Sequence, residues 1–149
     1  MLDDKVIVLD SEAQNRTEAL KLLAKKFVDH KIVQTSFIEA VLKREENFPT
    51  GLATEIIGVA IPHTDVQHVI RSQIGVMRLK APVNFFQMGD GKDVPVKIIF
   101  MLALTKPHEQ LEMLQKLIGL IQNKKLLIKI LNTNSIENVI SILETAGIE

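Results

Sequence analysis

The stretch Val96 to Leu104, VKIIFMLAL, constrains the fold of this chain more than any other. Eight of its nine residues are apolar. Such a run is typical of a β-strand with both faces covered, and in an open sheet the covering elements are helices. The strand needs one layer of helices on each side. We therefore expect the α/β class, as a three-layer α/β/α sandwich around a mixed β-sheet.

The remaining elements follow from periodicity and turn residues. Apolar residues at helical spacing predict helices at 13–28, from Ser36 through the charged run 43–46, from Pro107 to about Asn123, and at 125–131 and 135–146. Further strands are predicted at 5–9, 56–61, 72–79 and 83–86, with a loop at 47–55 and a turn at 88–93. Ser11 with Gln14, and Ser36 with Glu39, resemble helix-start signals. The 149 residues suit a single domain spanning 1–149.

Composition excludes several functional classes. Lysines and arginines number 18 against 18 acidic residues, a balance that argues against a nucleic-acid partner. The chain contains no cysteine, so a disulfide framework and a thiol nucleophile are both impossible. The N-terminus MLDDKVIVLD does not resemble a signal peptide, and no apolar run approaches the ~20 residues of a membrane helix. We expect a cytoplasmic protein.

Two Pro-His pairs stand just after predicted strands. Pro62-His63 ends the stretch GVAIPH, and Pro107-His108 follows LALTK. Sites in open α/β sheets gather beyond the carboxyl ends of strands. If the two strands are neighbours, both imidazoles can face one shallow pocket, and His108 would also lie in a first helical turn that attracts anions. A Pro-His pair can equally be a simple turn.

Other candidate residues leave alternatives open. Arg44 is either a solvated charge at a helix end or a guanidinium that reaches an anion pocket. His30 and His68 favour surface positions, although a zinc site is conceivable from four residues, His63, Asp65, His68 and His108. GDGK at 89–92 lacks the frame of a phosphate-binding P-loop, and no GxSxG elbow occurs. A chain without a nucleotide site that handles phosphate would have to receive it already activated.

Taken together, these residues resemble the EIIA proteins of the fructose–mannitol class of the bacterial sugar phosphotransferase system. The resemblance covers almost the whole chain. It is carried by GVAIPHT, by the preceding LKREE run, by the strand pair APVNFFQMGDGKDVPVKIIFMLAL and by HEQLEMLQKL. The FPTG loop and FFQMGDG resemble the galactitol-type branch most closely. Threonine after Pro-His departs from the small residue that is commoner in the family.

The resemblance implies a phosphotransferase component with a phosphohistidine intermediate and without metal or cofactor. His63 would accept a phosphoryl group from the phosphohistidine of HPr and pass it to a cysteine of an EIIB protein, which feeds a membrane EIIC permease for galactitol or a related sugar. His108 and Arg44 would stabilise the transferring group. The alternative is a regulatory protein of the same fold that senses phosphotransferase flux. Apolar residues in the flanking loops, Phe48, Val66 and Val69, are candidate partner contacts.

Overall fold

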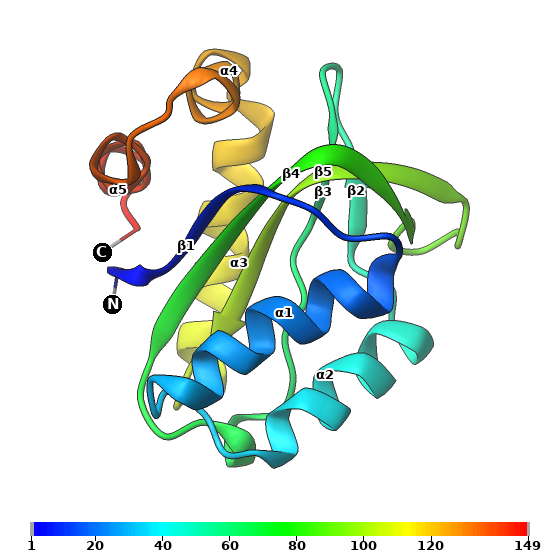
Figure 1. Cartoon of the computed structure of the whole chain (residues 1–149), viewed down its shortest axis with the longest axis vertical. Helices are drawn as coiled ribbons and strands as arrows, with labels where there is room; N and C mark the ends of the chain where they lie inside the picture. The colour runs from blue at the N-terminus through cyan, green and yellow to red at the C-terminus, as the bar shows by residue number, and fades with distance from the viewer. Residues whose placement is uncertain (1, 149) are drawn as a thin grey trace.

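The computed structural model describes residues 2–148, which contain a five-stranded mixed sheet (Figure 1). The strands are β1 (Leu2–Ser11), β2 (Gly51–Ala53), β3 (Gly58–Ala60), β4 (Gln73–Phe86) and β5 (Asp93–Ala103). Their order in the sheet is β1-β4-β5-β3-β2. β1 pairs in parallel with β4, and β3 in parallel with β5; the β4–β5 and β2–β3 pairs are antiparallel. The predicted apolar strand, VKIIFMLAL, corresponds to β5, the central strand.

Helices cover both faces of this sheet, as Figure 1 shows. One layer consists of α1 (Arg16–Asp29) and α2 (Ser36–Asn47), and the other of α3 (Pro107–Gln122), α4 (Lys124–Asn132) and α5 (Ile136–Thr145). β5 supplies alternate residues to the two cores: Ile99 and Met101 belong to the first, Ile98 and Phe100 to the second. The predicted three-layer sandwich is confirmed, and both-sided burial accounts for the apolar run.

The predicted loop at 47–55 contains a strand. β2 pairs with β3 through a turn at 54–57, in which the Thr54 hydroxyl accepts hydrogen bonds from the backbone N–H groups of Ile56 and Ile57. The turn takes up the first two residues of the predicted strand 56–61, and β3 is only three residues long. The predicted strands 72–79 and 83–86 are one long strand, β4, whose register shifts between Arg78 and Val83.

The start of α1 also differs from the prediction. The N-cap is Asn15, whose side-chain oxygen accepts from the Glu18 backbone N–H at 2.8 Å, and not Ser11, which ends β1. Asparagine is as good a cap as serine, and it stands where the strand has already ended. Pro107 begins α3 as predicted.

One buried arginine ties the C-terminal helices to the sheet. Arg78 of β4 is only 3% exposed and donates hydrogen bonds to the carbonyls of Ile130, Leu131 and Thr133, at the end of α4. Its other guanidinium nitrogen pairs with Asp10 at 3.0 Å. The last carbonyls of a helix lack intrahelical partners, so Arg78 satisfies groups that would otherwise be costly to bury.

Candidate functional site

The carboxyl ends of the parallel strands β3 and β5 meet at one edge of the sheet, and the candidate site lies there. Pro62 follows β3, and its carbonyl accepts a hydrogen bond from the Leu102 backbone N–H of β5 at 3.0 Å. Gly58 begins β3 so close to the Pro95 carbonyl that an added Cβ would clash with it. This close pairing holds the segment that leads to His63 rigidly against β5.

The His63 ring has a defined orientation. It is 9% exposed, and its Nδ1 lies 2.8 Å from the Ile61 carbonyl oxygen. A carbonyl can only accept, so Nδ1 carries the proton and Nε2 keeps its lone pair. Burial lowers the pKa of His63 from the ordinary 6.5, and the Arg44 cation adds to this; the Ile61 carbonyl and Asp65 act in the opposite direction. The ring is thus neutral at pH 7, with the lone pair of Nε2 available.

Arg44, in the last turn of α2, lies beside this ring. Its NH1 is 3.8 Å from a carboxylate oxygen of the exposed Asp65, and its guanidinium carbon lies 5.2 Å from the centre of the Phe48 ring. The Nε atom is buried, and no group in residues 2–148 forms a hydrogen bond with it. An exposed ion pair of this length adds little stability, which leaves the cation available to an anion. Of the two alternatives expected for Arg44, this is the position beside the pocket, and its role in phosphoryl transfer stays a prediction.

A cleft of about 230 Å³ connects His63 and Arg44 with the start of α3. From the helix it is lined by Pro107, Gln110, Leu111 and Leu114, and His108 is not among the lining residues. Positions 107, 110, 111 and 114 share one helical face, whereas 108 points about 100° away from 107. His108 is exposed. The two imidazoles therefore do not line one pocket, and the role predicted for His108 stays a prediction.

Gln110 occupies the place expected for the second histidine. Its Nε2 donates to the Thr64 carbonyl at 3.2 Å, and Thr64 directly follows His63. The sequence did not single out Gln110, because a glutamine within a helix has no signature comparable to a Pro-His pair. The helical spacing from Pro107 to Leu111 and Leu114 was the signal that could have found it.

The other histidines lie apart from the cleft lining. Nδ1 of His68 is 2.8 Å from the Ser36 hydroxyl, which joins the short helix η1 (Val66–His68) to the start of α2. His30 is the C-cap of α1. Within residues 2–148, no three histidine, aspartate or glutamate side chains are grouped as metal ligands. The zinc alternative has no support in this geometry.

Two exposed apolar side chains lie beside the cleft: Phe48, whose ring is next to Arg44, and Leu111, which lines it. Phe48 is 63% exposed and Leu111 is 60% exposed. The exposure of Phe48 is what a partner contact requires. Val66 and Val69 are half-buried, and Val69 packs against the first core, so they anchor their loop more than they present a contact.

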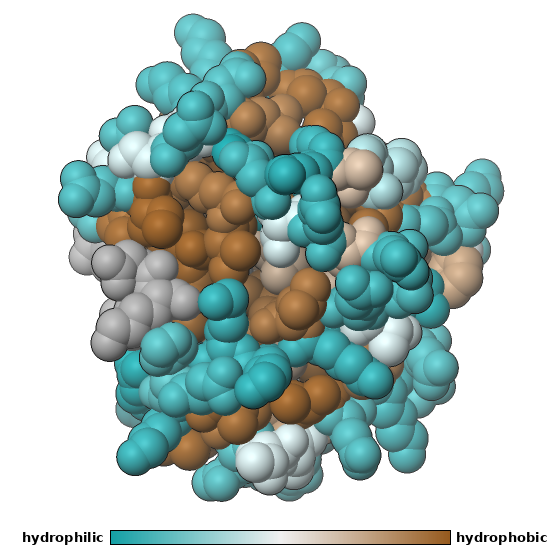
Figure 2. All heavy atoms as spheres, in the orientation of Figure 1, coloured by the Kyte–Doolittle hydropathy of each residue, from teal (hydrophilic) through white to brown (hydrophobic). Residues whose placement is uncertain are grey.

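On the face in Figure 2, polar side chains dominate over α1 and α2, and apolar side chains gather over β1.

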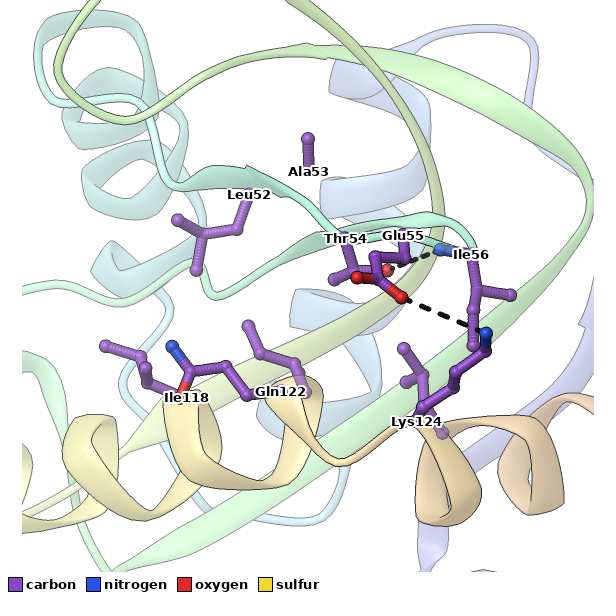
Figure 3. Close-up of a pocket in the computed structure, with 10 residues that line it drawn as sticks. Leu52, Ala53, Thr54, Glu55, Ile56, Ile118, Gln122 and Lys124 are labelled. Carbon is purple, nitrogen blue, oxygen red and sulfur yellow. Dashed lines mark hydrogen bonds and ion pairs between the residues drawn. The ribbon is translucent and has the colours of Figure 1, made fainter.

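A larger cavity lies at the other end of α3 and is separate from His63 (Figure 3). It has a volume of about 570 Å³ and lies between the β2–β3 turn and the helices α3 and α4. Its lining is mainly aliphatic, and at its rim Lys124 pairs with Glu55 at 3.8 Å. No histidine lines this cavity, so its size alone does not make it the candidate site.

Residues 1–146 match the model of the family described as "Phosphoenolpyruvate-dependent sugar phosphotransferase system, EIIA 2". The chain belongs to this family. Among curated relatives, the galactitol-specific EIIA component of Escherichia coli K12 is 32% identical over 108 residues, 72% of each chain. The EIIA resemblance and its galactitol-like branch are thus confirmed. In residues 2–148, no helix combines the length and the apolar character that crossing a membrane requires.

Solved EIIA structures share the fold. Mannitol EIIA of E. coli, in a complex with phosphorylated EIIB, aligns with a TM-score of 0.79 at 20% identity and covers 97% of this chain and 99% of that one. The nitrogen regulatory protein IIA-Ntr of Neisseria meningitidis aligns with a TM-score of 0.77 at 28% identity, covering 95% of each chain. The chain is thus a phosphotransferase-system protein with the α/β architecture of mannitol-type EIIA domains.

Proposed function

We propose that this EIIA protein is a phosphocarrier with His63 as its phosphoacceptor. It takes a phosphoryl group from the phosphohistidine of HPr and passes it to a cysteine of an EIIB protein, in the cytoplasm, for uptake of galactitol or a related sugar through an EIIC permease. One observation carries the proposal: the Ile61 carbonyl holds Nδ1–H of His63 and leaves Nε2 as the free nucleophile. The galactitol-specific E. coli relative and the EIIA–EIIB complex support the sugar and the acceptor.

The transfer consists of two balanced displacements. In the first, the Nε2 lone pair of His63 attacks the phosphorus of the donor phosphohistidine, and the electrons of the broken N–P bond return to the donor ring. In the second, a thiolate of the partner attacks the same phosphorus, and the bond electrons return to Nε2. Because Nδ1 keeps its proton throughout, the phosphorylated ring carries positive charge and is a good leaving group. Such transfer depends mainly on alignment and charge stabilisation.

Arg44 and the start of α3 supply that stabilisation. The Arg44 cation lies beside the ring, where a guanidinium matches the geometry of phosphoryl oxygens. Pro107 begins α3 at the cleft, and the first backbone N–H groups of a helix attract anions. We assign to Gln110 the donor role that the resemblance gave to a second histidine, because Gln110 lines the cleft.

A regulatory role is the second candidate. The similarity to IIA-Ntr, at 28% identity, favours it. A regulatory protein would accept phosphate from HPr and would then act by binding other proteins, with no onward transfer to a sugar EIIB. Onward transfer therefore separates the two functions.

The test is incubation with phosphoenolpyruvate, enzyme I and HPr, followed by mapping of acid-labile phosphate. Wild type should carry one phosphoryl group on His63, and addition of a galactitol-type EIIB should remove it. His63→Ala should accept none and keep its fold, because the residue lies at the rim of the sheet; His30→Ala, away from the cleft, should behave as wild type. Acceptance by His63→Ala at the normal rate would show that the nucleophile is another residue.

A further inference from the structure

A buried polar network lies behind the cleft, and the transfer steps above do not use it. Its members are Glu45, which is 2% exposed, and Thr50, which is 3% exposed. Glu45 is the residue after Arg44 in α2, and Thr50 lies in the FPTG loop just before β2. A buried carboxylate is costly unless it is well bonded, so this one calls for a physical explanation.

Both oxygens of Glu45 are bonded to one residue. The Thr50 backbone N–H donates to Oε2 at 2.6 Å, and the Thr50 hydroxyl donates to Oε1 at 2.7 Å. Burial raises the pKa of Glu45, while the two bonds from Thr50 and the cation of Arg16 oppose the increase. The carboxylate thus fixes both the backbone and the hydroxyl orientation of Thr50.

The hydroxyl of Thr50 makes a second contact that leads toward the active ring. It accepts a hydrogen bond from the Ile61 backbone N–H at 3.1 Å. The hydroxyl has a single proton, which Glu45 accepts, so its lone pairs face Ile61. β3 ends at Ala60, and the N–H of the next residue, Ile61, is bonded to this hydroxyl.

Ile61 is therefore held on one side by Thr50 and holds His63 on the other. Its N–H donates to Thr50, and its carbonyl accepts from Nδ1 of His63. Three hydrogen bonds thus connect Glu45 to His63. They join Glu45 to Thr50 at 2.7 Å, Thr50 to Ile61 at 3.1 Å and Ile61 to His63 at 2.8 Å. The same helix end that carries Arg44 toward the cleft also anchors the backbone on which the ring rests.

We propose that Glu45 and Thr50 are positioning residues for His63. By fixing Ile61, they place its carbonyl where it binds Nδ1–H, and they thereby select the tautomer whose Nε2 is free to attack. The proposal rests on the proposed function of His63. A purely structural network would tie the FPTG loop to α2 and would have no influence on the imidazole.

The first experiment measures the tautomer of His63 and needs no partner protein. Nitrogen-15 NMR of the ring in the neutral state should show Nδ1 protonated in wild type. In Thr50→Val, which has the same shape but no hydroxyl, the relative population of the Nε2–H tautomer should increase roughly fivefold or more. Thr50→Ser should restore the wild-type ratio, and Glu46→Gln, an exposed neighbour of Glu45, should leave it unchanged.

The second experiment measures single-turnover transfer from phosphorylated HPr in the same variants. Thr50→Val should be slowed about 10- to 100-fold, the typical effect of a misplaced reacting group, with Thr50→Ser close to wild type. If Thr50→Val does not fold, Glu45→Gln replaces it, because an amide cannot accept from both Thr50 donors and should shift the tautomer ratio in the same direction.

Unchanged tautomer ratios in every folded variant would overturn the positioning role, whatever the rates are. Failure of the proposed function gives a different result: wild type itself would take no phosphoryl group on His63, while the NMR comparison would still stand. A rate loss in Thr50→Val with an unaltered tautomer would assign the network to loop structure only.

Discussion

Replacing Gln110 should damage phosphoryl transfer far more than replacing His108. The Nε2 amide of Gln110 has two hydrogens, and one of them is bonded to the Thr64 carbonyl. The other is free for an oxygen in the cleft that Gln110 lines. His108 is exposed and lies outside that lining, so its ring has no comparable access.

The expected losses of stability and rate follow from the two N–H groups of the Gln110 side chain. Loss of the bond to Thr64 should reduce the free energy of unfolding by about 1 kcal/mol, a typical value for a neutral hydrogen bond. Loss of a preorganised donor to a transferring group typically costs ~3 kcal/mol of activation free energy, or about a hundredfold in rate. Gln110→Ala should therefore show a modest stability change and a large rate change, and His108→Ala should stay within about threefold of wild type.

Quenched-flow single-turnover transfer from HPr, and onward to EIIB, would measure both steps. Gln110→His retains a ring donor and should be less impaired than Gln110→Ala, whereas Gln110→Glu adds a negative charge and should be more impaired. If His108→Ala is slower than Gln110→Ala, the assignment from the cleft is refuted, and His108 is the stabilising residue that the resemblance implies.

Two further predictions concern the ring and its rim. Burial puts the folded-state pKa of His63 below 6.5, so between that pKa and 6.5 the unfolded chain binds more protons than the folded one. Stability should therefore begin to decrease as pH falls below about 6.5, and transfer should decrease only at lower pH, where the folded ring itself is protonated. An NMR titration giving a pKa at or above 6.5 would contradict this. Phe48→Ser should weaken HPr binding by roughly tenfold with little effect on stability, because the ring is exposed at the cleft. Leu22→Ser, on the outer side of α1, is the matched control. If calorimetry gives the two variants the same affinity for HPr, Phe48 is not part of the HPr contact.

The layered architecture was predictable because it depends on local patterns. A strand covered on both faces is apolar at nearly every position, and VKIIFMLAL meets that condition at eight of its nine residues. Helix starts at Pro107 and Ser135 were equally local. Strand β2 was not predictable, because it is three residues long and is defined by its pairing with β3 and not by its own composition.

The candidate site was predictable in part. His63 and Arg44 stood out because each ends a recognisable element, a strand and a helix. The roles of Gln110 and Thr50 depend on which side chains meet in space. Their hydrogen bonds join residues 46 and 11 positions apart, and composition does not reveal such contacts.

The contacts of Arg78 affect which parts of the molecule unfold together. Because one guanidinium holds the end of α4 to β4 and to Asp10, fluctuations of the C-terminal layer cannot be independent of the sheet. The amide protons of α4 should exchange with solvent at a free energy close to that of the strands, as one cooperative unit. His63 and Arg44 lie at the strand-end edge, outside these contacts. A partner protein that moves His63 or Arg44 can therefore do so without breaking the Arg78 contacts that hold α4.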